Sequence, residues 1–110
     1  MVLRLRQAQD FEQLLERSKT APVVIFKHST QCAISDEAYQ EFERFVQTAR
    51  ELTFGMVLVI EDREVSNVIA ARLGVRHESP QVILIENGRP KWNASHWRIT
   101  VEALSEAVRN

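Results

Sequence analysis

Three short runs of consecutive apolar residues most constrain how this chain can fold. They span residues 23–26, 56–60 and 82–85 and are rich in valine, isoleucine and leucine. Runs of this length and composition are typical of strands that are buried on both faces. None approaches the roughly 20 residues that a membrane-spanning helix needs. The chain is therefore expected to build a sheet whose two faces are both covered.

Helical patterns separate these runs. The clearest one lies between residues 34 and 52, where apolar side chains recur every three or four positions and charged side chains lie between them. Gly55 is expected to end this pattern. Another helix is predicted near residues 9–18. The apolar positions of the long pattern are Ile34, Ala38, Phe42, Phe45, Ala49 and Leu52.

The ends of the later helices also carry sequence signals. Asp62 is a plausible N-cap for a third helix, and Gly74 lies where a C-terminal helix glycine is typical. Thr100 is predicted to cap the last helix.

Two further strands complete the predicted sheet. Residues 2–5 alternate in polarity, and Asn87-Gly88 is a strong hairpin-turn dipeptide. The return strand is expected over residues 91–97, with Trp92 and Trp97 packing on the hairpin. The order is β-α-β-α-β-α-β-β-α, which predicts an α/β fold with helices on both faces. We expect one domain over residues 1–110 with a mixed sheet, mostly parallel, in which the hairpin supplies an antiparallel edge.

Composition excludes several functional classes. The chain has 14 Lys and Arg residues and 15 Asp and Glu residues, so its formal charge is −1. This near-balance leaves no excess of positive charge with which to bind nucleic acid or an anionic membrane. One cysteine cannot close a disulfide within its own chain. The histidines at positions 28, 77 and 96 follow no metal-ligand spacing, so no metal site is expected. The N-terminal residues offer no secretory apolar segment, which favours the cytoplasm.

The one cysteine, Cys32, is the candidate reactive group. It follows the first buried run and opens the long helix, where unpaired N–H groups and partial positive charge favour a thiolate. Lys27 and His28 could add positive potential, whereas Asp36 and Glu37 act against it. A buried, inert cysteine is the alternative. The junction of strand and helix favours the reactive interpretation, because ligands bind at the carboxyl ends of parallel strands.

The order and spacing of several motifs resemble a known family. The segment from His28 to Ser35 occupies the place of Cys-x-x-Cys in the thioredoxin fold, and residues 73–88 look like the thioredoxin segment around its proline. More closely, residues 26–35 and 94–100 resemble the YtxJ-like proteins, the monothiol bacilliredoxins of bacillithiol-using bacteria. The resemblance covers nearly the whole chain and implies a thioredoxin-like fold.

The resemblance implies a role for each motif. Cys32 would be catalytic, and His77, Ser79 and Pro80 would belong to a loop that meets the substrate. Most X–Pro bonds are trans, but the resemblance implies a cis Ser79–Pro80 bond beside Cys32.

Two positions near the cysteine differ from the usual dithiol or family pattern. Ser35 stands in place of a second cysteine. It cannot resolve a mixed disulfide, but it could donate a hydrogen bond to the thiolate or be an ordinary polar residue. Ala33 stands where the family usually has proline, and it adds a backbone donor close to the sulfur. This departure bears on rate and redox potential more than on the role of Cys32.

The expected activity is thiol–disulfide exchange through Cys32. It would remove a low-molecular-weight thiol from the mixed disulfides of thiolated client proteins, with bacillithiol as co-substrate and no bound cofactor. Bacillithiol or a second oxidoreductase would supply the resolving thiol. Two alternatives are a non-enzymatic adaptor or stress protein that binds partners through the Pro80 segment, and a redox sensor that is itself thiolated.

Overall fold

The computed structural model describes residues 1–110, and its element order is the predicted one. None of its helices combines the length and the apolar character that crossing a membrane requires. The elements are β1 (Val2–Arg4), α1 (Ala8–Arg17), β2 (Val23–His28), α2 (Ala33–Thr48), β3 (Thr53–Leu58), α3 (Arg63–Leu73), β4 (Gln81–Glu86), β5 (Arg89–Ser95), the 3₁₀ turn η1 (His96–Arg98) and α4 (Val101–Arg109).

The five strands form one mixed sheet in the order β1-β3-β2-β4-β5. β3 pairs in parallel with both β1 and β2, whereas β4 runs antiparallel to β2 as well as to β5. The antiparallel part of the sheet therefore begins one strand earlier than expected. Because Lys27 pairs with Gln81, the start of β4 lies at the carboxyl end of β2.

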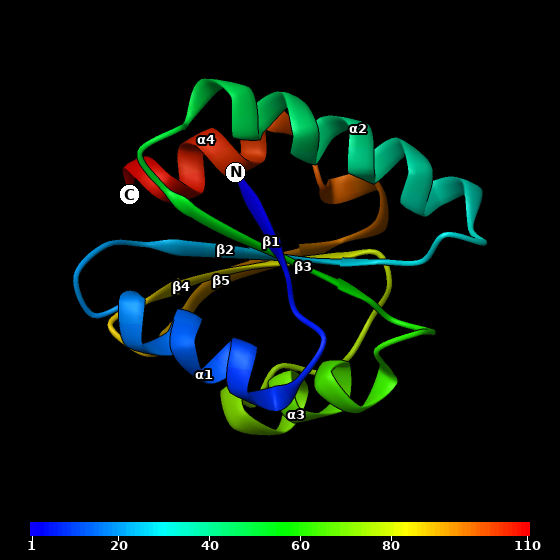
Figure 1. Ribbon diagram of the computed structural model, residues 1–110. Coiled ribbons are helices and arrows are strands. Elements are labelled where there is room, and N and C mark those ends of the chain that lie inside the picture. The colour runs from blue at the N-terminus through cyan, green and yellow to red at the C-terminus, as the bar shows by residue number, and fades with distance from the viewer.

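Two helical layers cover the sheet (Figure 1). α2 and α4 lie on one face, and α1 and α3 lie on the other. Side chains of β2 alternate between the layers: Val24 and Phe26 join the core under α2 and α4, while Val23 and Ile25 join the core over α1 and α3. The predicted burial of both sheet faces is confirmed.

The boundaries of α2 and β3 differ from the prediction. α2 ends at Thr48, so Leu52 lies beyond the helix that its spacing suggested. Gly55 lies inside β3 rather than ending a pattern. At this point α1 approaches the strand so closely that a Cβ on Gly55 would lie 2.6 Å from Leu14 Cδ1. A glycine in a strand can mark such a close approach.

The predicted helix ends are correct in position. The hydroxyl of Thr100 accepts a hydrogen bond from the Ala103 amide at 3.0 Å, and Gly74 has the positive φ of 67° that a C-cap glycine adopts. Asp62 occupies the N-cap position of α3, but its carboxylate pairs with Arg4 at 3.2 Å instead of capping the helix.

The return strand of the hairpin is shorter than predicted. β5 ends at Ser95, and residues 96–98 form η1. Trp92 packs against the core, but Trp97 is 65% exposed on η1. The expected hairpin packing of Trp97 is therefore wrong, because the chain leaves the sheet before reaching it.

Candidate active site around Cys32

Cys32 lies between the end of β2 and the start of α2. It is the N-cap residue of α2, with extended backbone angles, and its side chain is half-buried. Its carbonyl accepts the Asp36 amide at 3.1 Å, which begins the helix. No side chain caps the amides of the first turn. The sulfur is therefore carried at the positive end of a 16-residue helix, where unpaired N–H groups favour an anion.

Ser35 is fully buried beneath this turn. Its Oγ lies 2.7 Å from His28 Nδ1 and accepts the Ser29 amide at 2.9 Å. Both partners lie on the segment that leads to Cys32. Ser35 therefore ties the first turn of α2 to the end of β2, a role that the sequence analysis did not anticipate.

His28 faces the α2 side of the sheet. Its ring stacks on Phe26 at 5.5 Å and on Tyr39 at 5.0 Å between ring centres. Burial lowers the pKa of His28 below its usual value, and the carboxylates of Asp36 and Glu61 oppose this effect. The imidazole is consequently neutral at pH 7 and acts as a hydrogen-bonding group rather than as a positive charge.

Lys27 faces the opposite side of the sheet. Its side chain is fully buried, and its ammonium donates to the Ser66 carbonyl at 3.2 Å and to His77 Nδ1 at 3.1 Å. Burial lowers the pKa of Lys27 to about 8. Of the residues expected to support the thiolate, Ser35 and His28 thus lie together, whereas Lys27 contacts α3 and His77.

The segment of residues 75–80, called the Pro80 loop below, joins α3 to β4. Its Ser79–Pro80 peptide bond is cis, as the resemblance implied. The Pro80 carbonyl accepts the His96 amide at 3.1 Å, and Glu78 Oε1 accepts the Ser95 hydroxyl at 3.1 Å. The loop is therefore held by the end of β5 and the start of η1, at the end of the sheet where β2 leads to Cys32.

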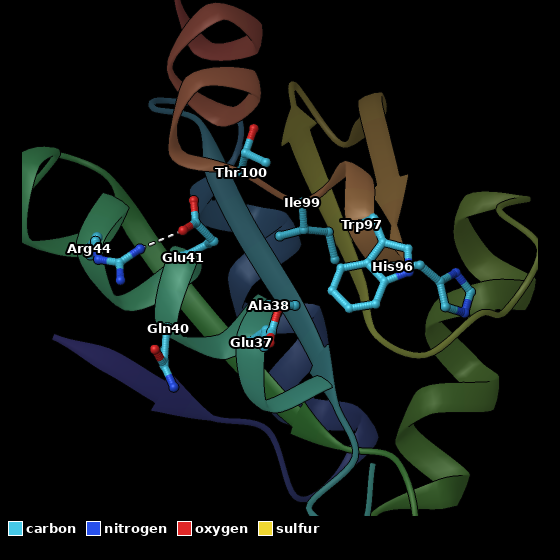
Figure 2. Close-up of a pocket in the computed structure, with 9 residues that line it drawn as sticks. All are labelled: Glu37, Ala38, Gln40, Glu41, Arg44, His96, Trp97, Ile99 and Thr100. Atoms are coloured by element: carbon cyan, nitrogen blue, oxygen red, sulfur yellow. Dashed lines mark hydrogen bonds and ion pairs between the residues drawn. The ribbon is translucent and has the colours of Figure 1, made fainter. Parts of the chain in front are cut away.

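A groove of about 340 Å³ lies between α2 and η1 (Figure 2). Its α2 wall begins at Glu37, five residues beyond Cys32, or about 7.5 Å along the helix axis. Its other wall begins at His96, which bonds the Pro80 loop. The groove thus extends from the part of α2 that follows Cys32 to the η1 residue that bonds the Pro80 loop, and Cys32 itself does not line it. Its lining residues are Glu37, Ala38, Gln40, Glu41, Arg44, His96, Trp97, Ile99 and Thr100.

Sequence reasoning missed this groove. The available signal was the segment of residues 94–100, which supported the family resemblance but was assigned no role in binding. The backbone turn that exposes Trp97 includes a positive φ of 55° at His96, an uncommon conformation for a non-glycine residue. No cluster of three His, Cys, Asp or Glu side chains could hold a metal ion.

Solved structures place the whole fold among thioredoxin-like proteins. A protein assigned as an oxidoreductase with a thioredoxin fold is 35% identical, with a TM-score of 0.88 over 96% of this chain and 92% of its own. The thioredoxin of Fasciola hepatica is 21% identical, with a TM-score of 0.77 over 97% and 96% of the two chains. Thioredoxin from Trypanosoma brucei brucei is 13% identical, with a TM-score of 0.80 over 99% and 88%. These two thioredoxins support the fold alone.

A family model makes the assignment more specific. The model described as "Monothiol bacilliredoxin BrxC" matches residues 3–104, which is nearly all of the chain. The match includes Cys32, Ser35 and the Pro80 loop. Together with the oxidoreductase relative, it supports a thiol redox function for a thioredoxin-like domain. The chain belongs to the monothiol bacilliredoxin BrxC family.

Proposed function

We propose that this protein removes a small thiol, bacillithiol, from the mixed disulfides of client proteins through Cys32. The observation that carries the proposal is the placement of the chain's one thiol, half-buried at the uncapped N-terminus of α2. We place the approaching substrate sulfur between α2 and the Pro80 loop, because the start of β4 lies at the carboxyl end of β2, which leads to Cys32. Because such exchange needs a reduced thiol, we place the protein in the cytoplasm.

The reaction is one thiol–disulfide exchange step. The Cys32 thiolate attacks the bacillithiol sulfur of the client's mixed disulfide, and a new bond forms between Cys32 and that sulfur. The bond between the client and bacillithiol breaks, and the client leaves as a thiolate that takes a proton from water. Cys32 is oxidised to the mixed disulfide as the client is reduced.

The cycle closes with a thiol from outside the chain. Ser35, in the place of a second cysteine, has a hydroxyl that cannot attack a disulfide, and its Oγ is engaged by His28 and Ser29. A second bacillithiol, or the thiol of a partner oxidoreductase, attacks the bacillithiol sulfur of the adduct. This attack returns Cys32 as a thiolate and leaves the small thiol in a new disulfide.

The test is release of a client thiol from a protein with one cysteine that carries bacillithiol. The wild type should free this thiol, and Cys32→Ala should not. A matched control moves the single thiol to α4 in the variant Cys32→Ala/Ser105→Cys, which should also be inactive. Parallel clients that carry glutathione or coenzyme A show which small thiol is accepted. Equal release by the wild type and Cys32→Ala would contradict the proposal.

A further inference from the structure

Lys27 is a buried cation without a carboxylate partner. Its side chain is fully buried, and the two acceptors of its ammonium are the Ser66 carbonyl and His77 Nδ1. Taking a charge out of water costs stability unless an opposite charge compensates it, and neither acceptor carries one. Burial lowers the pKa of Lys27 to about 8, because it disfavours the charged form of the side chain. A leucine or methionine at this position would fill the core without this cost.

The contacts of the ammonium lead to the Pro80 loop rather than to the sulfur. Lys27 and its neighbour His28 face opposite sides of the sheet, and α2 with Cys32 covers the His28 side. Gln81 is the register partner of Lys27 across β2 and β4, so the two side chains share a face. The Gln81 amide donates to the Arg76 carbonyl at 3.0 Å. Two consecutive loop residues therefore accept hydrogen bonds from side chains of the sheet: Arg76 from Gln81, and His77 from Lys27.

The geometry also fixes which nitrogen of His77 carries the proton. An ammonium can only donate, so His77 Nδ1 accepts from Lys27 and the neutral ring carries its hydrogen on Nε2. The Ser66 hydroxyl lies 3.2 Å from the same Nδ1. Partial desolvation of the ring lowers the pKa of His77, the charges of Lys27 and Arg63 lower it further, and Glu78 opposes them. The ring therefore remains an acceptor at neutral pH.

The two halves of the loop have different supports. Glu78 accepts a hydrogen bond from Ser95 at the end of β5, and Pro80 accepts one from His96 at the start of η1. His77 is exposed, and its bonded contacts are Lys27 and Ser66. Loss of the ammonium should therefore loosen His77, while Arg76 keeps its bond from Gln81 and the later half of the loop keeps its own bonds.

We propose that Lys27 is a positioning residue for the exchange reaction. Its buried ammonium fixes His77, and together with Gln81 it holds the Pro80 loop in the geometry that receives a thiolated client. It leaves the reactivity of Cys32 unchanged. The choice of client rests on the proposed function, whereas the restraint on the loop is a property of this chain alone.

The kinetic test compares variants that remove either partner of the contact. Lys27→Met and His77→Leu should each raise the KM for a bacillithiol-carrying client roughly three- to tenfold and leave kcat nearly unchanged. The double variant should be no worse than either single one, because the two residues act as one unit. His77→Asn should restore the wild-type KM, since its amide oxygen can replace Nδ1. Lys19→Met, on the surface, is the matched control.

Two further readouts separate positioning from other roles. Alkylation of Cys32 by iodoacetamide should proceed at the wild-type rate in every variant. The backbone order parameter of residue 77, from NMR relaxation, should be lower in Lys27→Met and His77→Leu, and unchanged in His77→Asn and Lys19→Met. The relaxation measurement needs no client, so it decides the loop restraint even where no thiol transfer is seen.

Three results would overturn the inference. The first is a Lys27→Met variant whose alkylation slows as much as its KM rises, because Lys27 would then act on the thiol. The second is multiplicative effects in the double variant, which would make the two residues independent. The third is an unchanged backbone order parameter at residue 77 in both single variants. A wild type that releases no client thiol contradicts the proposed function instead, and NMR relaxation alone then judges the restraint.

Discussion

Ser35 stabilises the structure around Cys32, a role that its place in the motif does not suggest. Its buried Oγ accepts the Ser29 amide and pairs with His28 Nδ1, so removing it leaves two polar groups without a partner. Leaving such groups unpaired costs about 1–3 kcal/mol. We expect Ser35→Ala to lower the free energy of unfolding by about that amount in urea denaturation. Ser105→Ala, at a half-buried helical serine, is the control, and equal losses in both variants would show that the contacts contribute nothing.

A cysteine at position 35 would add the resolving thiol that the chain lacks. Residue 35 lies three positions after Cys32, in the first turn of the same helix. Ser35→Cys loaded with bacillithiol at Cys32 should therefore form an internal disulfide and release the small thiol after dilution into thiol-free buffer. The wild-type adduct should persist, as intact-mass measurement would show. An adduct that persists equally in both proteins would mean that position 35 cannot reach the sulfur.

The buried position of Ser35 changes what that experiment requires. A site expected to be polar and tolerant is closed and doubly hydrogen-bonded. The Ser35→Cys variant should therefore be less stable than the wild type, and its release of bacillithiol should be measured well below its unfolding temperature.

His28 makes stability depend on pH. Burial lowers the pKa of His28 in the folded protein below the value of about 6.5 in the unfolded chain. As the pH falls through 6.5, the unfolded chain binds the proton first, so the free energy of unfolding falls. His28→Asn, which keeps an acceptor near the Nδ1 position, should show a shallower fall between pH 7.5 and 5.5 in urea titrations. A fall as steep as that of the wild type would assign the pH dependence elsewhere, with His77 the next group to test.

At the scale of elements, the close approach of α1 to β3 depends on the absence of a side chain at Gly55. A Cβ at Gly55 would lie 2.6 Å from Leu14 Cδ1 and 3.3 Å from Leu5 Cδ1, and both leucines are buried. Overpacking of this kind costs about 1–3 kcal/mol. Gly55→Ala should lower the midpoint of urea denaturation, and Leu14→Ala should recover part of the loss in the double variant. Additive losses would mean that Leu14 does not meet the new methyl group.

Gly55 also shows which features of the elements could be predicted. The runs 23–26 and 82–85 identified β2 and β4 because their own apolar residues determine them. The start of β3 could not be predicted, because the reason for its glycine is a helix some forty residues earlier in the chain. The same limit applies to Asp62, whose carboxylate pairs with Arg4 of β1 instead of capping α3.

At the scale of the whole molecule, the candidate site is divided by the sheet. His28 and Ser35 lie with α2, while Lys27 and His77 meet beside α3. The division was accessible from sequence, because adjacent residues of a strand face opposite sides. The contact between Lys27 and His77 was not, since fifty residues separate them and only the antiparallel pairing of β4 with β2 brings the Pro80 loop to this end of the sheet.

The most direct test of the central claim is the intact mass of this protein after mixing with a client that carries bacillithiol, with no other thiol present. We predict that one bacillithiol passes in disulfide linkage from the client to Cys32, so that the protein gains the mass of bacillithiol less two hydrogens while the client loses the same mass, and that Cys32→Ala gains nothing. This prediction would be contradicted if the client kept its adduct, or if Cys32 became joined to the client itself instead of to the small thiol.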